Sequence, residues 1–313
     1  MVESWRHHLD EFRALPRGEP IEVAPTASTR TVLTIGCAGN VPVHFVKLHY
    51  PRRISRFNRR FRRKNIHNSI EGSRDVAHVQ LDRFAYLPDV LGFTYGKGGN
   101  DWGFLVREAT CHPYQAKRFL IPYFALYGGD LKHREDPPLI ERLNAEPQSF
   151  VIEQIMIPVL ECWAKVVREH GILMESHAQN ILLEIFHEFR PTRVVHRDFD
   201  VSVDPDVRRQ AGLEVPFLGS LIGSDTNYPK EQHYSLVYDR FIGNELFDYL
   251  LKLLKRFYFA DEDRVRSRVK EAFHRNFRDS RRFFPNTMFY FSNELLPGND
   301  FRLVDMQQAP QWR

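Results

Sequence analysis

Apolar and polar residues follow two different spacings along the chain, and the change comes near residue 145. Before it, short apolar runs are separated by turn residues, a pattern typical of strands. Three of these runs predict strands: Thr31–Ile35, Val41–Leu48 and Phe104–Arg107. One stretch differs, because the apolar residues of Arg53–Lys64 recur at every third or fourth position and predict a helix.

After residue 145 the helical spacing dominates. A broad apolar stripe runs along Gln148–His170, and Gly171 ends it, as glycine commonly does after a helix. Pro158 lies inside this stretch and is expected to kink it or divide it in two. Three more segments predict helices: Ile181–Phe189, Tyr234–Phe257 and Asp261–Phe277. Val194–Phe199 predicts a strand that ends in charged residues.

These elements predict an α+β fold with two domains. A sheet-containing lobe over residues 1–145 precedes a mainly helical lobe over residues 146–313, and the polar stretch Lys132–Pro138 marks the break between them. The 313 residues are enough for two such units. We expect a ligand cleft between the lobes, because domain interfaces commonly hold ligands.

Composition is that of a soluble globular protein, with 42% hydrophobic and 27% charged residues. No apolar run approaches the roughly 18 residues that cross a bilayer. The polar N-terminal stretch lacks the apolar core of a signal peptide, so we expect a cytosolic protein. Three scattered cysteines (Cys37, Cys111 and Cys162) predict neither disulfides nor a zinc site.

The net charge of +4 is unevenly spread, since residues 52–64 hold eight Arg or Lys in thirteen positions. This run has two readings: a solvated face of a basic helix, or an anion site for phosphates or nucleic acid. Phe57 and Phe61 within it could stack on bases, but their helical spacing favours burial in the core.

Two weaker signals precede and overlap this run. Thr26-Ala-Ser-Thr-Arg-Thr31 clusters hydroxyls around one arginine, a set that can wrap a phosphate or form an ordinary turn. Lys47 ends a predicted strand, and Ser55 and Arg59 follow it on the basic helix, so that Lys47 and Arg59 could face a shared anion. The alternative is that Lys47 projects into solvent from an alternating strand.

The most informative set is Glu175-Ser-His-Ala-Gln-Asn180, followed by Asp198 within His196-Arg-Asp-Phe199. Asn and Asp oxygens suit Mg²⁺, and a nearby His and Gln can bind a triphosphate. The alternative makes Asn180 the N-cap of a helix over Ile181–Phe189. The HRD tripeptide does not indicate a protein kinase, because position 203 is Val where a kinase needs Asn.

Taken in order, these pieces resemble the IucA/IucC family of siderophore synthetases, which work without a nonribosomal peptide synthetase. The family's motifs are matched at Ser28-x-Arg30-Thr31, Lys47-Leu48, Ile54–Arg59, Arg107-Glu108, Glu175-x-His177-x-Gln179-Asn180 and Arg197-Asp198. The resemblance covers about residues 24–300. Its strength lies in the joint order and spacing of the motifs rather than in any one of them.

The resemblance implies a ligase that uses ATP and Mg²⁺ in siderophore biosynthesis for iron acquisition. It activates a carboxylate of citrate or a citryl intermediate as an acyl-adenylate, and an amine or amino alcohol then displaces AMP. By motif match, the phosphates would be bound by Ser28, Arg30, Thr31, Lys47, Arg59, His177 and Gln179. His177, Arg30 and Lys47 would be catalytic, and Glu175, Asn180 and Asp198 would hold Mg²⁺.

The chain also departs from the family. We expect it to lack the N-terminal portion with an HP-x-HP-x-x-K element, and Gln308-Ala-Pro310 stands where the family has N-P-L. Either a separate partner chain supplies that portion, or this is a shortened member that acts as a nucleotide-binding or partner subunit. The family resemblance further implies a homodimer. The lack of a long apolar run predicts no membrane partner, and the helical spacing of Phe57 and Phe61 disfavours a nucleic-acid partner.

Overall fold

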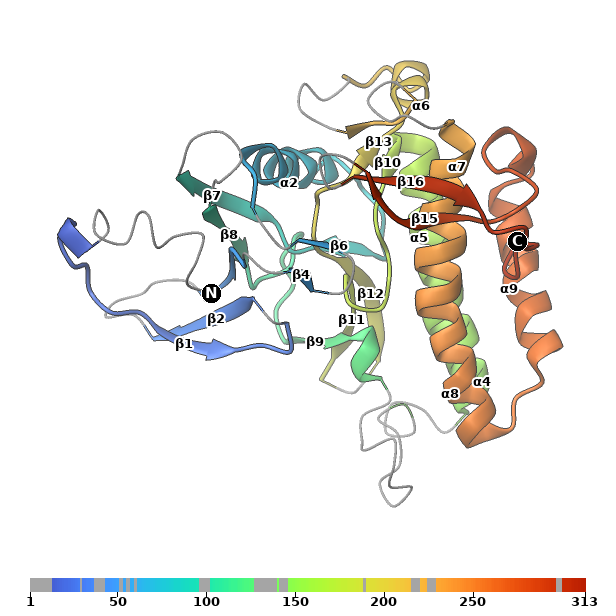
Figure 1. The fold of residues 1–313 in the computed structure, drawn as a ribbon. Helices are drawn as coiled ribbons and strands as arrows, with labels where there is room; N and C mark the ends of the chain where they lie inside the picture. The colour runs from blue at the N-terminus through green and yellow to red at the C-terminus, as the bar shows by residue number, and fades with distance from the viewer. Residues whose placement is uncertain are drawn as a thin grey trace.

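The computed structural model describes residues 13–28, 30–36, 43–50, 53–54, 57–58, 61–95, 102–126, 140, 146–187, 190–214, 220–223, 229–296 and 300–313. The α+β class predicted from the sequence is confirmed, with two main sheets and a set of long helices (Figure 1). Among the described residues, no helix combines the length and the apolar character needed to cross a membrane.

The first sheet is antiparallel, in the order β1-β2-β3-β8-β7. Its strands are β1 (Glu22–Pro25), β2 (Thr31–Gly36), β3 (His44–Leu48), β7 (Asp89–Tyr95) and β8 (Trp102–Glu108). Helix α2 (Arg63–Val76) packs on one face, where a side chain at Gly92 would come 2.0 Å from Ile66 Cγ2. Because Lys47 pairs with Leu105 across β3 and β8, Lys47 and Arg107 lie on this same face, beside the helix.

The prediction of a helix over Arg53–Lys64 is wrong. Two short paired strands, β4 (Arg53–Ile54) and β5 (Phe57–Asn58), occupy this stretch, and α2 begins only at Arg63. The apolar spacing misled because Phe61 is buried before the helix starts, against Ile66 and Leu105. The real helix was missed because much of its buried face is polar or small, at Asn68, Ser69, Gly72 and Ser73.

The second sheet has the order β6-β12-β11-β9, from β6 (Phe84–Tyr86), β9 (Arg118–Pro122), β11 (Ile181–Phe186) and β12 (Pro191–His196). A helix over Ile181–Phe189 is therefore also wrong, and so is Asn180 as its N-cap. Ile181 to Ile185 are all buried, and a continuous apolar run on a fully buried strand cannot be told from a helix by spacing alone. The strand predicted at Val194–Phe199 is confirmed as β12, although β12 begins and ends a few residues earlier than the predicted range.

The long helices after residue 145 are confirmed. One continuous run contains α4 (Pro147–Phe150), the π-helix η3 (Val151–Met156) and α5 (Ile157–His170), which ends at Gly171 with a positive φ of 64°. A second contains α7 (Lys230–Ser235), the π-helix η4 (Leu236–Phe247) and α8 (Asp248–Tyr258). Helix α9 (Glu262–Asn276) is capped by Asp261. Pro158 lies where η3 passes into α5, so the helix continues through it.

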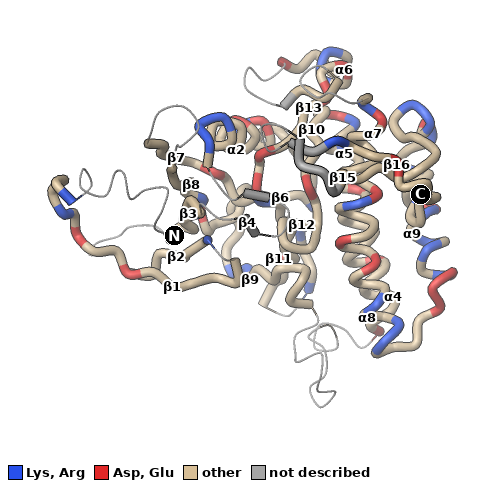
Figure 2. Tube along the Cα trace, viewed as in Figure 1, with Lys and Arg blue, Asp and Glu red and all other residues tan. Residues whose placement is uncertain are grey.

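Shorter elements complete the chain. They are η2 (Tyr123–Ala125), β10 (Ile172–Leu173), β13 (Ser202–Val203), α6 (Pro205–Gln210), β14 (Ser220–Leu221), η5 (Ser280–Arg282), β15 (Phe289–Leu296) and β16 (Asp300–Asp305). The main core joins the long helices to β11 and β12. Acidic and basic residues are interspersed along α9 (Figure 2).

The predicted division into residues 1–145 and 146–313 stays a prediction. The second sheet draws β6 and β9 from the first range and β11 and β12 from the second. Lys132–Pro138, the proposed break, lies outside the described residues.

Candidate functional site

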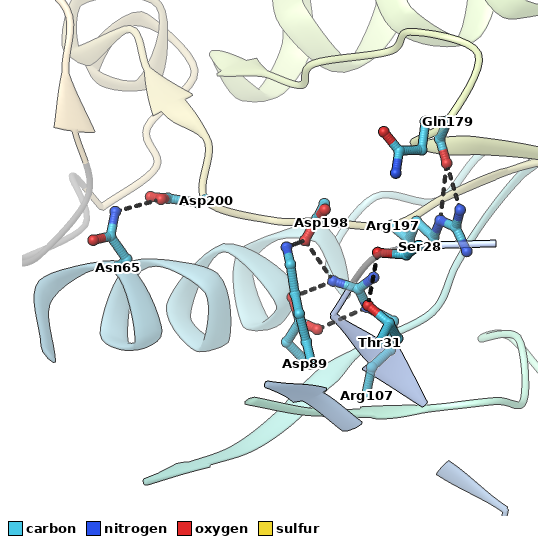
Figure 3. Close-up of polar contacts among 10 residues, drawn as sticks. Ser28, Thr31, Asn65, Asp89, Arg107, Gln179, Arg197, Asp198 and Asp200 are labelled. Carbon is cyan, nitrogen blue, oxygen red and sulfur yellow. Dashed lines mark hydrogen bonds and ion pairs between the residues drawn. The ribbon is translucent and has the colours of Figure 1, made fainter. Parts of the chain in front are cut away.

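Asp198 is the centre of the densest polar cluster that the motifs predicted. Strand β12 ends at His196, and Asp198 then adopts a positive φ of 72°, a conformation that Asp tolerates better than most residues. Its Oδ1 accepts hydrogen bonds from the ammonium of Lys47 and from Arg107 Nη2, the second at 2.8 Å (Figure 3). Two strands of the first sheet thus meet the end of a strand of the second at this carboxylate.

Arg107 is held in turn by a second carboxylate that the sequence analysis missed. Its Nε and Nη2 donate to Asp89 at 2.8 and 3.1 Å, and the Asp89 side chain is fully buried. The Asp89 N–H donates to Ser73 Oγ of α2 at 2.9 Å. Asp89 belongs to no motif, and only the fold brings it to Arg107 by cross-strand pairing.

Charge and burial oppose one another at this cluster. Burial alone would raise the pKa of Asp198, but Lys47 and Arg107 hold it well below its usual range. Burial lowers the pKa of Lys47, and the positive charges of Arg107 and Arg30 act in the same direction, against the pull of Asp198. Asp198 is therefore ionised at neutral pH, and Arg30 lies close enough to influence Lys47.

The Thr26–Thr31 loop brings its hydroxyls to the same place. The Thr26 hydroxyl donates to the Thr31 carbonyl at 2.8 Å, and the Thr31 hydroxyl donates to Ser28 Oγ at 3.2 Å. Thr31 pairs with Lys47 across β2 and β3, so that Ser28, Arg30 and Lys47 lie near one another. The Arg30 guanidinium lies 4.5 Å from the centre of the Phe61 ring.

The Glu175–Asn180 loop is tied to the end of β12. Arg197 Nε and Nη2 donate to the Gln179 carbonyl at 3.0 and 2.6 Å, and the Arg197 N–H donates to the Asn180 carbonyl at 3.0 Å (Figure 3). His177 is half-buried, with its ring centre 5.7 Å from that of Phe241 and its Nδ1 accepting the Gln179 N–H at 3.2 Å. The loop therefore lies next to Asp198 and is partly open to solvent.

Acidic residues border the cluster on its other side. Asp200 accepts hydrogen bonds from the side-chain amides of Asn65 and Asn68 on α2, at 2.7 and 3.3 Å. Burial raises the pKa of the Glu175 carboxyl to about 8, and nearby Asp200 and Asp198 add to the effect, although the residue as a whole is exposed. The sequence held one indication that Asp200 lies near the site, namely its position two residues after Asp198.

The fold brings together five of the predicted site residues: Ser28, Arg30, Thr31, Lys47 and Asp198. It also holds the loop that contains Glu175, His177, Gln179 and Asn180 beside Asp198 through Arg197, so both halves of the chain contribute. Ser55 and Arg59 lie outside the described residues. Three groups that contribute to the cluster were absent from the predicted set: Asp89, Asp200 and Arg107, the last of which was matched only as part of a motif.

The donor set fits Mg²⁺ if other ligands come from a substrate. Within the part of the chain that the structure describes, no group of three or more His, Cys, Asp or Glu residues could hold a metal ion by itself. Mg²⁺, however, usually binds one or two protein oxygens together with phosphates and water. Asp198 Oδ2 and the Asn180 side chain make no hydrogen bond to the described residues.

Comparison with known proteins places this geometry in context. Residues 150–281 match the family described as "Ferric iron reductase FhuF-like transporter". Over 116 residues the chain is 32% identical to citryl-spermidine/3,4-dihydroxybenzoyl-citryl-spermidine:spermidine ligase of Bacillus anthracis, an alignment that covers 36% of this chain and 17% of the ligase. The matched segment 150–281 contains one cysteine, Cys162.

Solved structures match over nearly the whole chain. The petrobactin biosynthesis protein AsbB of Bacillus anthracis superposes with a TM-score of 0.72 at 18% identity, over 99% of this chain and 57% of AsbB. The chain has the fold of the siderophore synthetases. Aerobactin synthetase IucC of Klebsiella pneumoniae gives a TM-score of 0.64 at 16% identity, over 90% of this chain and 52% of IucC.

The ATP-bound aerobactin synthetase IucA of Klebsiella pneumoniae gives a TM-score of 0.61 at 16% identity, over 86% of this chain and 51% of IucA. The resemblance to the IucA/IucC synthetases inferred from the motifs is confirmed at the level of the fold. The chain spans little more than half the length of the synthetases whose structures it matches.

Proposed function

We propose that this protein activates a citrate-type carboxylate with ATP and Mg²⁺ and joins it to an amine or hydroxyl in siderophore biosynthesis. The observation that carries the proposal is the meeting of Lys47 and Arg107 at Asp198, with Arg30 close to Lys47, in a chain with the synthetase fold. We further infer that the protein works in the cytosol as a homodimer.

In the first step, a carboxylate oxygen attacks the α-phosphorus of ATP. An oxygen–phosphorus bond forms, the bond to pyrophosphate breaks, and an acyl-adenylate results. Two anions approach one another in this step, so cationic groups must offset the developing charge. Arg30 and Lys47 are suited to this, with hydroxyls of Ser28 and Thr31 as additional donors. His177 would stabilise charge on the departing pyrophosphate, and Gln179 and Arg59 complete the predicted set.

Mg²⁺ would be held by Asp198 and Asn180, with Glu175 as a nearby additional ligand or hydrogen-bonding group. Bound there, it would offset negative charge on the phosphates. Asp198 is suited to this because its carboxyl stays ionised between Lys47 and Arg107. In the second step, the amine or hydroxyl attacks the acyl carbon and AMP leaves, which requires chiefly a positioned nucleophile.

Pyrophosphate exchange tests the first step separately from the second. The protein is incubated with ATP, Mg²⁺, labelled pyrophosphate and a panel of citrate-like acids, without any amine. We expect label to enter ATP only when an accepted acid is present, and hydroxylamine to trap the same acid as a hydroxamate. Absence of exchange with every acid, with and without a candidate partner chain that supplies the rest of the synthetase, would sink the proposal.

The alternative is a shortened, catalytically altered member that binds nucleotide or serves as a partner subunit. AsbB superposes on this chain over 57% of its own length. Calorimetry separates the two functions, because this alternative predicts binding of ATP·Mg with no pyrophosphate exchange under any of the conditions above.

A further inference from the structure

One aromatic ring in the basic run lies beneath two of the proposed phosphate-binding cations. The centre of the Phe61 ring is 4.5 Å from the Arg30 guanidinium carbon and 5.9 Å from Lys47 Nζ. The two cations come from different segments, the loop before β2 and the strand β3. Phe61 is therefore the group that Arg30 and Lys47 share.

The ring is firmly held from behind. Phe61 is 4% exposed and packs with Ile66 of α2 and Leu105 of β8, while its own N–H donates to His49 Nδ1 at 3.2 Å. Such burial rules out the reading in which Phe61 stacks on nucleic-acid bases, because a base needs an open ring face. A site supported by a buried ring is also less free to rearrange than one on an exposed loop.

Two like charges close together repel, and a site for a polyanion must hold them together before the anion arrives. A carboxylate would do so, but it would also occupy their N–H donors and cancel their charge. The face of an aromatic ring attracts a cation through its quadrupole while leaving hydrogen-bond donors available to a ligand. In this site Lys47 donates a hydrogen bond to Asp198 on one side, and the Phe61 ring lies against both cations on another.

We propose that Phe61 is a positioning residue, whose ring holds Arg30 and Lys47 in place for the phosphates of ATP. The inference deepens the proposed function and rests on it. It differs from a purely structural role, in which any apolar side chain of similar volume at position 61 would serve equally well.

The experiment compares binding of ATP·Mg by calorimetry in variants that keep or remove the ring. Phe61→Leu and Phe61→Met remove it with little change of polarity, and Phe61→Tyr keeps it. We expect Kd to rise about five- to thirtyfold in the first two variants and to stay within about twofold in Phe61→Tyr. Phe93→Leu is the matched control, because Phe93 stacks on Phe104 in the same sheet and is 42% exposed, and its Kd should not change.

Thermal unfolding of each variant separates lost binding from lost folding. If Phe61→Leu does not fold, Phe61→Met replaces it, since the unbranched and flexible Met side chain adapts better to the space left by the ring. Folded Leu or Met variants with the wild-type Kd would overturn the inference, as would a Tyr variant as weak as Leu. Wild-type protein that binds no ATP·Mg would instead overturn the proposed function, and with it the site that Phe61 supports.

Discussion

At the scale of single residues, the site depends on one carboxylate that is balanced by two cations. Asp198 accepts hydrogen bonds from Lys47 and Arg107, whereas Asp200, two positions later, accepts them from the neutral amides of Asn65 and Asn68. The two aspartates belong to the same short segment, but Asp198 has charged partners and Asp200 has neutral ones. This contrast provides a matched pair of substitutions.

We expect Asp198→Asn to lower pyrophosphate exchange by at least about a hundredfold, because it removes the charge that is proposed to hold Mg²⁺ and to balance Lys47. Asp200→Asn should lower it by less than about tenfold, since Asp200 touches neither cation. Initial rates of exchange at saturating ATP measure both. Equal losses in the two variants would remove Asp198 from its proposed role.

The pair between Arg107 and Asp89 makes a prediction about stability. Both side chains are buried, so Arg107→Met would leave a carboxylate buried without its partner. We expect this to lower the free energy of unfolding by about 3–5 kcal/mol. The control is Arg74→Met, whose pair with Glu71 is exposed and should contribute no more than about 1 kcal/mol. Urea denaturation of both variants measures the difference, and similar values would contradict the account.

At the scale of elements, the first sheet and α2 must approach closely for the site to form. Gly92 permits this, because a Cβ there would lie 2.0 Å from Ile66 Cγ2. We expect Gly92→Ala to lower the free energy of unfolding by about 1–3 kcal/mol through overpacking, and to weaken ATP·Mg binding as α2 shifts. Gly18→Ala, where a Cβ meets nothing within 4 Å, should change neither quantity. A Gly92 variant of unchanged stability would show that α2 can move without cost.

Helix α7 contains a buried histidine that makes stability depend on pH. Burial lowers the pKa of His233 to about 4, whereas an exposed or unfolded histidine has a value near 6.5. At a pH between these two pKa values, His233 is therefore protonated in the unfolded chain and neutral in the folded chain. Stability from this residue is complete above about pH 6.5 and is lost as the pH falls toward 4, by on the order of 3 kcal/mol.

His233→Gln should therefore flatten the loss of stability between pH 6.5 and 4, as followed by denaturant unfolding at a series of pH values. His274→Gln, on the exposed side of α9, should leave the profile as it is in the wild type. Parallel profiles for wild type and His233→Gln would contradict the prediction.

Elements whose buried positions recur at a regular spacing are easier to predict from the sequence than elements without such a spacing. The helices after residue 145 and strand β8 have a spacing that matches their burial. Strand β11 is buried on both faces, and α2 buries Asn68 and Ser73, so neither displays the expected alternation. Their partners in the fold decide their structure, and those partners are distant in sequence.

At the scale of the whole molecule, the site is made where three parts of the chain meet. The first sheet contributes Lys47 and Arg107, and α2 contributes the asparagine amides that donate to Asp200. Asp198 follows the end of β12, and the Glu175–Asn180 loop is hydrogen-bonded to the same segment. The motifs predicted the residues of this site whose chemistry is distinctive. They could not predict Asp89 or the role of Phe61, because an aspartate and a phenylalanine acquire these roles only through contacts that the fold creates.

The same view explains why the order of the motifs was informative although each was weak alone. Ser28 and Asp198 are far apart in sequence, and the fold brings them to the same place through Thr31 and Lys47. We therefore expect one triphosphate to be bound from both halves of the chain. The first half supplies the cations, and the second half supplies the Glu175–Asn180 and Asp198 segments.

A crystal structure with a non-hydrolysable ATP analogue and Mg²⁺ tests this claim most directly. We expect phosphate oxygens within hydrogen-bonding distance of Arg30 and Lys47, and a metal ion bound to Asp198 or Asn180. An analogue bound elsewhere, or a fully occupied analogue whose phosphates contact neither Lys47 nor the Glu175–Asn180 loop, would contradict it.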